Sequence, residues 1–150
     1  MSCLPSPIIV DRLLQVWLLE DIGRGDYTTE GLFTEETKIH QAKWVLKEDG
    51  VIAGLPIAAR VFQLLDKEVK FSLTAKEGDF CPSGTKIADI EGSREALLTG
   101  ERVALNLAMR LSGIATATRS YVEKINDLPT RLVDTRKTTP GLRVLEKYAT

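Results

Sequence analysis

The order of elements after residue 92 constrains the fold more than any other feature of the sequence. A long helical pattern over residues 93–125 is followed at once by an extended segment at 130–136, and a second helical pattern begins near Leu142. An apolar stripe runs along the long helix: Val103, Leu107, Leu111 and Ile114. Helix, strand, turn and helix in this order are typical of an α/β layer or barrel. A complete barrel needs roughly 250 residues, so we predict an incomplete one.

The residues before this region have the pattern of a mixed sheet with helices packed on it. Pro7 and Pro56 each mark the first turn of an apolar helix. The segment EGDFCPSG has the composition of a turn. Segments that resemble strands are 41–47, 51–54, 69–74 and 85–90. We therefore expect the α/β fold class, with a mixed sheet and helices in front of the incomplete barrel.

The charge of the chain argues against one class of partner. It has 20 Lys or Arg residues and 21 Asp or Glu residues, with a net charge of −1. This balance gives no overall basic field of the kind that holds nucleic acid through its phosphates. Residues 131–150 nevertheless carry five Lys or Arg residues against two Asp or Glu residues. We expect no nucleic-acid partner, and the cations are concentrated in the C-terminal segment.

The segment DTRKTTPGLR holds most of these cations. Arg136 and Lys137 fall where the expected strand enters its loop, and α/β barrels place their working residues at such points. A guanidinium fork suits a carboxylate or phosphate and the Lys adds a compact charge, so a ligand with more than one anionic group would match them. Thr135 and two further threonines would add hydroxyl donors. Two alternatives stay open from these residues alone: solvated surface cations, and an exposed phosphorylation site for a basophilic kinase.

The cysteines and the single histidine indicate no metal centre and no disulfide. Cys3 and Cys81 form no C-x-x-C pair, and His40 is the only His. We expect a reduced, cytoplasmic protein. The apolar run IIVDRLLQVWLLED is interrupted by Asp11 and Arg12 and has neither a basic leading segment nor a small-residue cleavage site. We therefore expect no signal peptide and no membrane partner.

Three carboxylates near Gly23 raise a separate possibility. Glu20, Asp21 and Asp26 could bind a divalent cation through hard oxygen ligands. The spacing of an EF-hand loop is absent, and Asp26 is typical of a helix N-cap or a turn. We therefore predict no metal site in this chain.

Three longer strings carry a resemblance to a known family. LLEDIGRGDYTT, GERVALNLAMRLSGIAT and DTRKTTPGLRVLEKYA occur in this order, and together they resemble the quinolinate phosphoribosyltransferases, the carboxylating nicotinate-nucleotide pyrophosphorylases. The resemblance runs from about Leu18 to the last residue. It implies an α+β N-terminal sandwich domain with a linking helix at residues 1–112 and the beginning of an incomplete α/β barrel at residues 113–150. It also implies transfer of phosphoribose from phosphoribosyl pyrophosphate to quinolinate, with decarboxylation to nicotinate mononucleotide in NAD biosynthesis.

The resemblance assigns roles to individual residues. Arg136 and Lys137, with Thr135 beside them, match the positions that hold the carboxylates of quinolinate in the family. Arg102 matches an arginine that reaches into the partner subunit's site, which implies a homodimer with a shared active site. Arg143 belongs to the same string, and we expect it to have a structural role at the start of the last helix. The family also implies Mg²⁺ acting with phosphoribosyl pyrophosphate, with no ligands for it in this chain.

The sequence departs from the family in its length. The later barrel strands of the family carry a His-Arg pair, a further Lys and acidic residues near the ribose and the metal, and these have no counterpart after Thr150. Catalytic residues are therefore unassigned. We expect the N-terminal half of a homodimeric enzyme. The alternatives are a non-catalytic scaffold or interaction fragment of the same fold, and a related phosphoribosyltransferase-like protein with another substrate.

Overall fold

The computed structural model describes residues 4–23 and 39–150. The helices in these ranges are α1 (Pro7–Ile22), α3 (Leu55–Leu65), α4 (Arg94–Lys124) and α5 (Arg143–Tyr148). The strands are β1 (Ile39–Val45), β2 (Gly50–Val51), β3 (Lys70–Leu73), β4 (Phe80–Cys81) and β5 (Lys86–Ser93).

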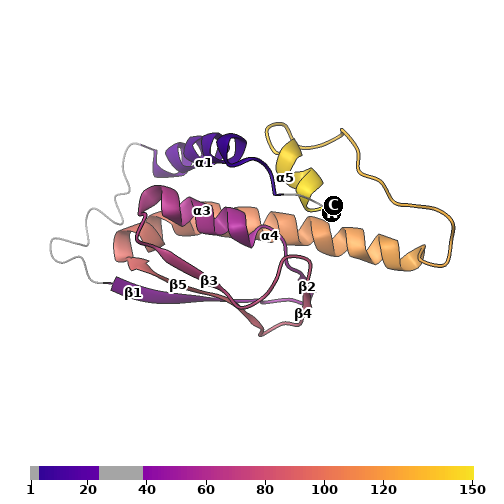
Figure 1. The fold of residues 1–150 in the computed structure, drawn as a ribbon, viewed down its shortest axis with the longest axis horizontal. Helices are drawn as coiled ribbons and strands as arrows, with labels where there is room; N and C mark the ends of the chain where they lie inside the picture. The colour runs from indigo at the N-terminus through magenta and orange to yellow at the C-terminus, as the bar shows by residue number, and fades with distance from the viewer. Residues whose placement is uncertain (1–3, 24–38) are drawn as a thin grey trace.

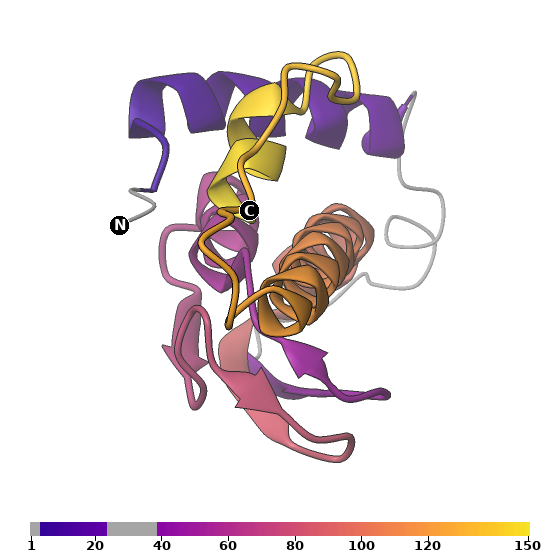
Figure 2. The same ribbon diagram turned by 90° about the vertical axis from the view of Figure 1, so that its right-hand side faces the viewer.

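These elements form three layers. The three-stranded sheet lies at the base, α3 and α4 pack on one of its faces, and α1 and α5 lie over these helices on the side away from the sheet (Figure 1). Viewed nearly along α4, this helix lies between the sheet and the layer of α1 and α5 (Figure 2). All three layers contribute fully buried side chains, among them Leu14, Phe62, Leu111, Leu145 and Ala88. This arrangement confirms the predicted α/β fold class.

Strand β5 is the centre of the antiparallel sheet, whose order is β1-β5-β3. Ala88 pairs with Trp44 of β1 on one side and with Leu73 of β3 on the other. A separate two-stranded ladder joins Val51 of β2 to Phe80 of β4. The expected strands at 41–47, 51–54, 69–74 and 85–90 correspond to β1, β2, β3 and β5. Strand β4 lies in the segment EGDFCPSG, which was predicted as a turn. The sequence could not indicate this strand, because two residues are too few to show the alternation of a strand.

Three aromatic side chains join the sheet to the helical layer. The ring centroids of Trp44 and Phe71 are 5.5 Å apart, and Phe62 of α3 lies 6.2 Å from Trp44 and 5.9 Å from Phe71. Helix α4 comes close to this cluster at Gly100, where an added Cβ would lie 2.8 Å from Cδ1 of Phe62. Because no larger residue fits there without displacing the ring, Gly100 allows the long helix to pack directly on α3.

Helix α4 also supports β2 through two hydroxyl groups. The amide of Val51 donates a 2.8 Å hydrogen bond to Thr116 Oγ1, and the amide of Ala53 donates a 3.1 Å hydrogen bond to Ser112 Oγ. Ser112 Oγ in turn donates to the carbonyl of Ala53. These hydroxyls supply partners that a neighbouring strand would otherwise provide, since backbone groups away from water need partners. The LSGIAT part of the second string therefore has a structural role.

The predicted helices are confirmed. Helix α1 begins at Pro7 and ends before Gly23, and α4 is capped by Ser93, whose side chain accepts a hydrogen bond from the amide of Ala96. The predicted stripe of α4 faces the core, with Val103, Leu107 and Leu111 buried and Ile114 packed against them. Among the described helices, none has the length and apolar character that crossing a membrane requires.

The predicted strand at residues 130–136 is wrong. This segment belongs to an exposed, irregular connection that runs from the end of α4 back to α5 (Figure 1). A strand needs a hydrogen-bonded neighbour, and within residues 4–23 and 39–150 no strand pairs with these residues. The apolar residues of the segment indicated an extended backbone, but no described strand lies beside the segment to pair with it.

Candidate functional site

Residues 134–139, which we call the site loop, carry three of the four predicted binding residues. Thr135, Arg136 and Lys137 are all exposed, and the amide of Lys137 donates a 3.2 Å hydrogen bond to Thr135 Oγ1. Within the described part of the chain, the charged groups of Arg136 and Lys137 make no hydrogen bond or ion pair. Two adjacent cations that are open to solvent can bind a ligand with more than one anionic group.

Helix α5 holds both ends of the site loop. At the start of the site loop, Asp134 Oδ2 lies 2.6 Å from Nζ of Lys147 in α5. In the middle of the site loop, the carbonyl of Arg136 and the hydroxyl of Thr138 accept hydrogen bonds from the Arg143 side chain, at 3.4 Å and 3.2 Å. Arg143 is the first residue of α5. These contacts support the structural role expected for it, because its side chain fixes the backbone of the loop and leaves the Arg136 side chain open.

Glu146 of α5 fixes the other end of the site loop and joins it to α4. Its carboxylate accepts a 3.1 Å hydrogen bond from the amide of Thr139 and another of 3.1 Å from Arg110 Nε. Arg110 also donates to Thr139 Oγ1. The hydrogen bond from Arg110 lowers the pKa of the Glu146 carboxyl from its usual value, burial opposes this shift, and the bonds from Thr139 add to it. Glu146 is therefore charged at neutral pH.

Arg102 has different surroundings from the site loop. Its Nε donates to the carboxylate of Asp21 at the end of α1, 3.0 Å from Oδ1. The Arg102 side chain is 59% exposed. Arg110, which contacts the site loop, lies further along the same helix, about 12 Å away at about 1.5 Å per residue. The structure thus brings Thr135, Arg136 and Lys137 together in one loop, whereas Arg102 lies near Asp21.

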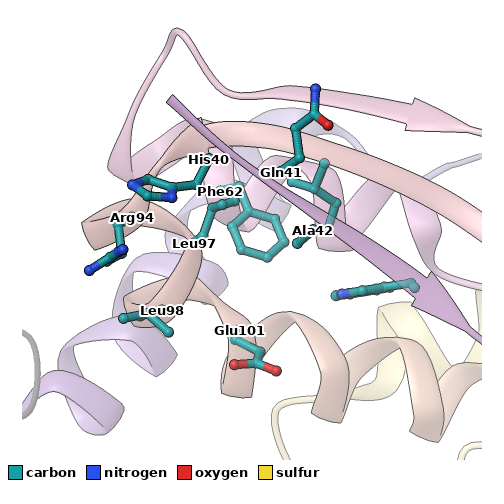
Figure 3. A pocket seen from close by; sticks show the side chains of 10 residues that line it. His40, Gln41, Ala42, Phe62, Arg94, Leu97, Leu98 and Glu101 are labelled. Carbon is teal, nitrogen blue, oxygen red and sulfur yellow. The ribbon is translucent and has the colours of Figure 1, made fainter. Parts of the chain in front are cut away.

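A pocket of about 240 Å³ lies between β1 and the first turns of α4. Side chains from both elements face this space, with Phe62 of α3 behind them (Figure 3). Its lining is mainly apolar, and its ionisable members are His40, Arg94 and Glu101. None of the four predicted binding residues lines it. No sequence signal indicated this pocket, because its lining residues form no motif and His40 is the only histidine in the sequence.

Two of the three carboxylates considered as metal ligands, Glu20 and Asp21, lie among the described residues. Asp21 is paired with Arg102, and Asp26 lies outside the described residues. Within residues 4–23 and 39–150 there is no group of three His, Cys, Asp or Glu side chains arranged to hold a metal ion.

Sequence reasoning missed Arg110 and Glu146. Both lie inside the strings that carry the resemblance, but nothing in their local spacing links them, because they are 36 positions apart. Glu146 and Arg143 are three residues apart on a helix and so share a face. That spacing could have indicated a polar face on α5 turned toward the preceding loop.

Comparison with known proteins agrees with these features. The family model described as "Quinolinate phosphoribosyl transferase, N-terminal domain" matches residues 26–112, and the model of the C-terminal domain matches residues 114–150. The chain is 62% identical over 149 residues to a probable carboxylating nicotinate-nucleotide pyrophosphorylase of Synechocystis sp., covering 99% of this chain and 50% of that protein. A probable enzyme of the same name from Bacillus subtilis is 49% identical over 138 residues, covering 92% of this chain and 47% of that protein.

Solved structures show the same fold. NadC from Streptococcus pyogenes has a TM-score of 0.91 and 44% sequence identity, covering 96% of this chain and 52% of that one. The nicotinate-nucleotide pyrophosphorylase from Francisella tularensis has a TM-score of 0.90 at 34% identity, covering 99% of this chain and 52% of that one. The chain spans about half the length of the relatives it matches. Since the two family models together match most of its residues, the chain belongs to the quinolinate phosphoribosyl transferase family.

Proposed function

We propose that this chain forms the quinolinate-binding part of an enzyme that transfers phosphoribose from phosphoribosyl pyrophosphate to quinolinate. The ring nitrogen of quinolinate would bond to the ribose carbon as pyrophosphate leaves. The carboxylate next to that nitrogen would then leave as CO₂, and a proton would take its place. The products would be nicotinate mononucleotide, pyrophosphate and CO₂, in NAD biosynthesis.

The observation that carries the proposal is the pair of open cations on the site loop. Quinolinate has two neighbouring carboxylates, and Arg136 and Lys137 are adjacent cations with no ion-pair partner among the described residues. A guanidinium binds one carboxylate through two parallel hydrogen bonds, and an ammonium binds the other as a compact charge. Thr135 lies beside them and can donate from its hydroxyl. Family membership supports this assignment because the whole site loop lies in the matched range 114–150.

Arg102 is proposed to act across a homodimer interface. It lies near the end of α1, away from the site loop, and its side chain is 59% exposed. Asp21 holds the Nε edge of its guanidinium, so the direction of the side chain is restrained. A two-fold dimer repeats each contact, and one site in each subunit would then receive Arg102 from the partner.

The metal and the location are also proposals. Mg²⁺ would accompany phosphoribosyl pyrophosphate, because pyrophosphate oxygens are the hard ligands it prefers. Among the described residues there is no group of three His, Cys, Asp or Glu side chains arranged to hold a metal ion. A cytoplasmic location is supported by Cys81, which is a buried free thiol, as is usual in a reducing compartment.

A direct assay tests the proposal. The full-length protein would be incubated with quinolinate, phosphoribosyl pyrophosphate and Mg²⁺, and nicotinate mononucleotide and CO₂ would be measured together. We expect equal amounts of both products, and no product when nicotinate replaces quinolinate, because nicotinate lacks the second carboxylate. The intact mass of the protein purified from its natural source would be measured in parallel.

Two outcomes would contradict the proposal. The absence of both products from a folded, full-length protein would favour a non-catalytic scaffold. A natural mass close to 16.6 kDa would remove the enzyme hypothesis for this chain. Turnover of a different pyridine carboxylate without CO₂ release would instead indicate a related phosphoribosyltransferase with another substrate.

A further inference from the structure

Helix α5 has one face that packs against the core and another that contacts the site loop. One face is apolar and anchors the helix, because Leu145 and Ala149 are buried in the core. The other face is polar and holds Arg143, Glu146 and Lys147, which are spaced so that they lie on one side of a helix. All three contact the site loop. The helix therefore connects the exposed loop to the fixed interior of the molecule.

Glu146 has a special place among these three residues. Among the described residues, the charged groups of Arg143 and Lys147 form hydrogen bonds or ion pairs only with the site loop, whereas the Glu146 carboxylate also accepts hydrogen bonds from Arg110 of α4. Its side chain is 12% exposed, compared with 44% for Arg110. The carboxylate thus lies at the junction of α4, α5 and the loop, largely shielded from water.

The position of this junction matters for the two open cations. Thr139 is two residues after Lys137, and both its amide and its hydroxyl are held, by Glu146 and Arg110 respectively. A free loop would have to be ordered each time a ligand bound, and ordering flexible segments costs conformational entropy that weakens binding. Two neighbouring cations also repel one another, which favours other loop conformations unless contacts hold the backbone in place.

We propose that Glu146 is a positioning residue for quinolinate: together with Arg110 it fixes Thr139, and thereby the place of Arg136 and Lys137, without touching the substrate itself. This inference rests on the proposed function. The lowered pKa of Glu146 is in keeping with it, because the charged carboxylate is the form that accepts all these hydrogen bonds.

A merely structural role predicts something different. Arg110, one partner of the Arg110–Glu146 ion pair, is exposed to solvent. Solvent-exposed ion pairs contribute little to global stability. Loss of a structural contact would affect the two substrates alike or change only stability. Loss of a positioning contact would affect quinolinate, which the site loop binds, and would spare phosphoribosyl pyrophosphate.

The test compares Glu146→Ala, Glu146→Gln and Arg110→Met in the full-length protein. For each variant, kcat and the KM of both substrates would be measured, together with urea unfolding. We expect Glu146→Ala to raise the KM of quinolinate about 10-fold or more with the KM of phosphoribosyl pyrophosphate within about twofold of wild type. Glu146→Gln keeps an oxygen that can accept from the Thr139 amide, so it should recover part of the loss.

The matched control is Glu123→Ala. Glu123 also pairs with an arginine of α4, Arg119, at 2.7 Å, but both are exposed and neither contacts the site loop. This variant should have wild-type constants for both substrates. Since Glu146 and Arg110 act on Thr139 as one unit, the double variant Arg110→Met with Glu146→Ala should lose little more than either single variant.

The results separate this inference from the proposed function. If Arg136→Ala raises the KM of quinolinate and neither Glu146→Ala nor Arg110→Met does, the positioning role is overturned and the proposed function stands. If Arg136→Ala leaves quinolinate binding unchanged, both are overturned. Equal increases in the two KM values would also overturn the positioning role. If Glu146→Ala fails to fold, Glu146→Gln and Arg110→Met decide the question by the same criterion.

Discussion

The hydroxyl of Tyr148 donates a hydrogen bond to the carboxylate of Glu77, 71 positions earlier in the chain. The same carboxylate accepts from the amides of Gly54 and Leu55, at 2.8 and 2.9 Å, where α3 begins. Glu77 thus caps the N-terminus of α3 from a distant turn, where the helix dipole favours a negative charge. Through Tyr148 it also connects α5 to the start of α3.

Removing the Tyr148 hydroxyl should lower the stability of the fold. Tyr148→Phe leaves the ring in place and removes a partly buried hydrogen bond to a charged group, which should cost about 1 to 2 kcal/mol of unfolding free energy. Urea unfolding measures this loss. Tyr121→Phe is the control, because Tyr121 is exposed and should show no change. Equal stability of Tyr148→Phe and wild type would mean that Glu77 holds α3 without help from α5.

The same contact predicts a dependence on pH. Burial, followed by the hydrogen bond to Glu77 and its charge, raises the pKa of Tyr148 above its usual value of about 10. Above pH of about 10 the unfolded state loses this proton while the folded state keeps it, so the contribution of Tyr148 is complete below that pH and is lost as the pH rises toward the folded pKa. The stability difference between wild type and Tyr148→Phe should therefore shrink above pH of about 10. A difference that stays constant between pH 8 and 11 would contradict the raised pKa.

The open cations should matter for turnover and not for folding. Arg136→Ala and Lys137→Ala should each lower kcat/KM by about 30- to 900-fold, equivalent to about 2 to 4 kcal/mol of transition-state stabilisation. The urea midpoint should stay unchanged, because an exposed loop cation contributes little to stability. Arg131→Ala is the matched control, since Arg131 is an exposed cation just before the site loop. Wild-type turnover in either of the first two variants would refute the assignment.

Arg102 should act on the site of the other subunit. Arg102→Ala and Arg136→Ala proteins, each nearly inactive alone, should regain activity when mixed, because a mixed dimer has one site with both defects and one with neither. With free exchange, about half of the dimers are mixed, so activity should approach about a quarter of the wild-type value. Native mass spectrometry would confirm the exchange. Exchange without recovery of activity would place Arg102 in its own subunit's site or outside any site.

Two glycines of α4 should respond in opposite directions to alanine. At Gly100 an added Cβ would lie 2.8 Å from Phe62, so Gly100→Ala should destabilise the protein by about 1 to 3 kcal/mol through overpacking. At Gly113 nothing lies within 4 Å, so Gly113→Ala should stabilise it by about 0.5 to 1 kcal/mol through better helix propensity. Thermal unfolding of both variants checks the pair. A stabilised Gly100→Ala protein would show that α3 and α4 can move apart at no cost.

The helices could be predicted from the sequence because their signals are local. Pro7, Pro56 and Ser93 mark helix starts, and the stripe that includes Val103 and Leu111 marks a buried face. The strand expected at 130–136 was wrong because a strand needs a hydrogen-bonded partner strand, and the residues of the segment itself do not indicate whether such a partner is present.

For the candidate site, the sequence indicated which residue types are exposed and where. The sequence placed Thr135 and Arg136 at the end of a strand, whereas the structure places them with Lys137 in one exposed loop. Their role in binding stays a prediction. The residues that fix this loop, Arg110 and Glu146, were not predictable, because the contact between them exists only after α4 and α5 have packed together.

Helix α4 runs without interruption from Arg94 to Lys124, and the two matched family ranges, 26–112 and 114–150, meet in its middle. A chimera of two relatives joined at residue 113 would therefore build one helix from two parents. Its first half would have been selected against one parent's α3, and its second half against the other parent's β2, which Thr116 contacts. Recombination should be tolerated better at a crossover after residue 125, in the exposed connection, where few packed contacts would be exchanged.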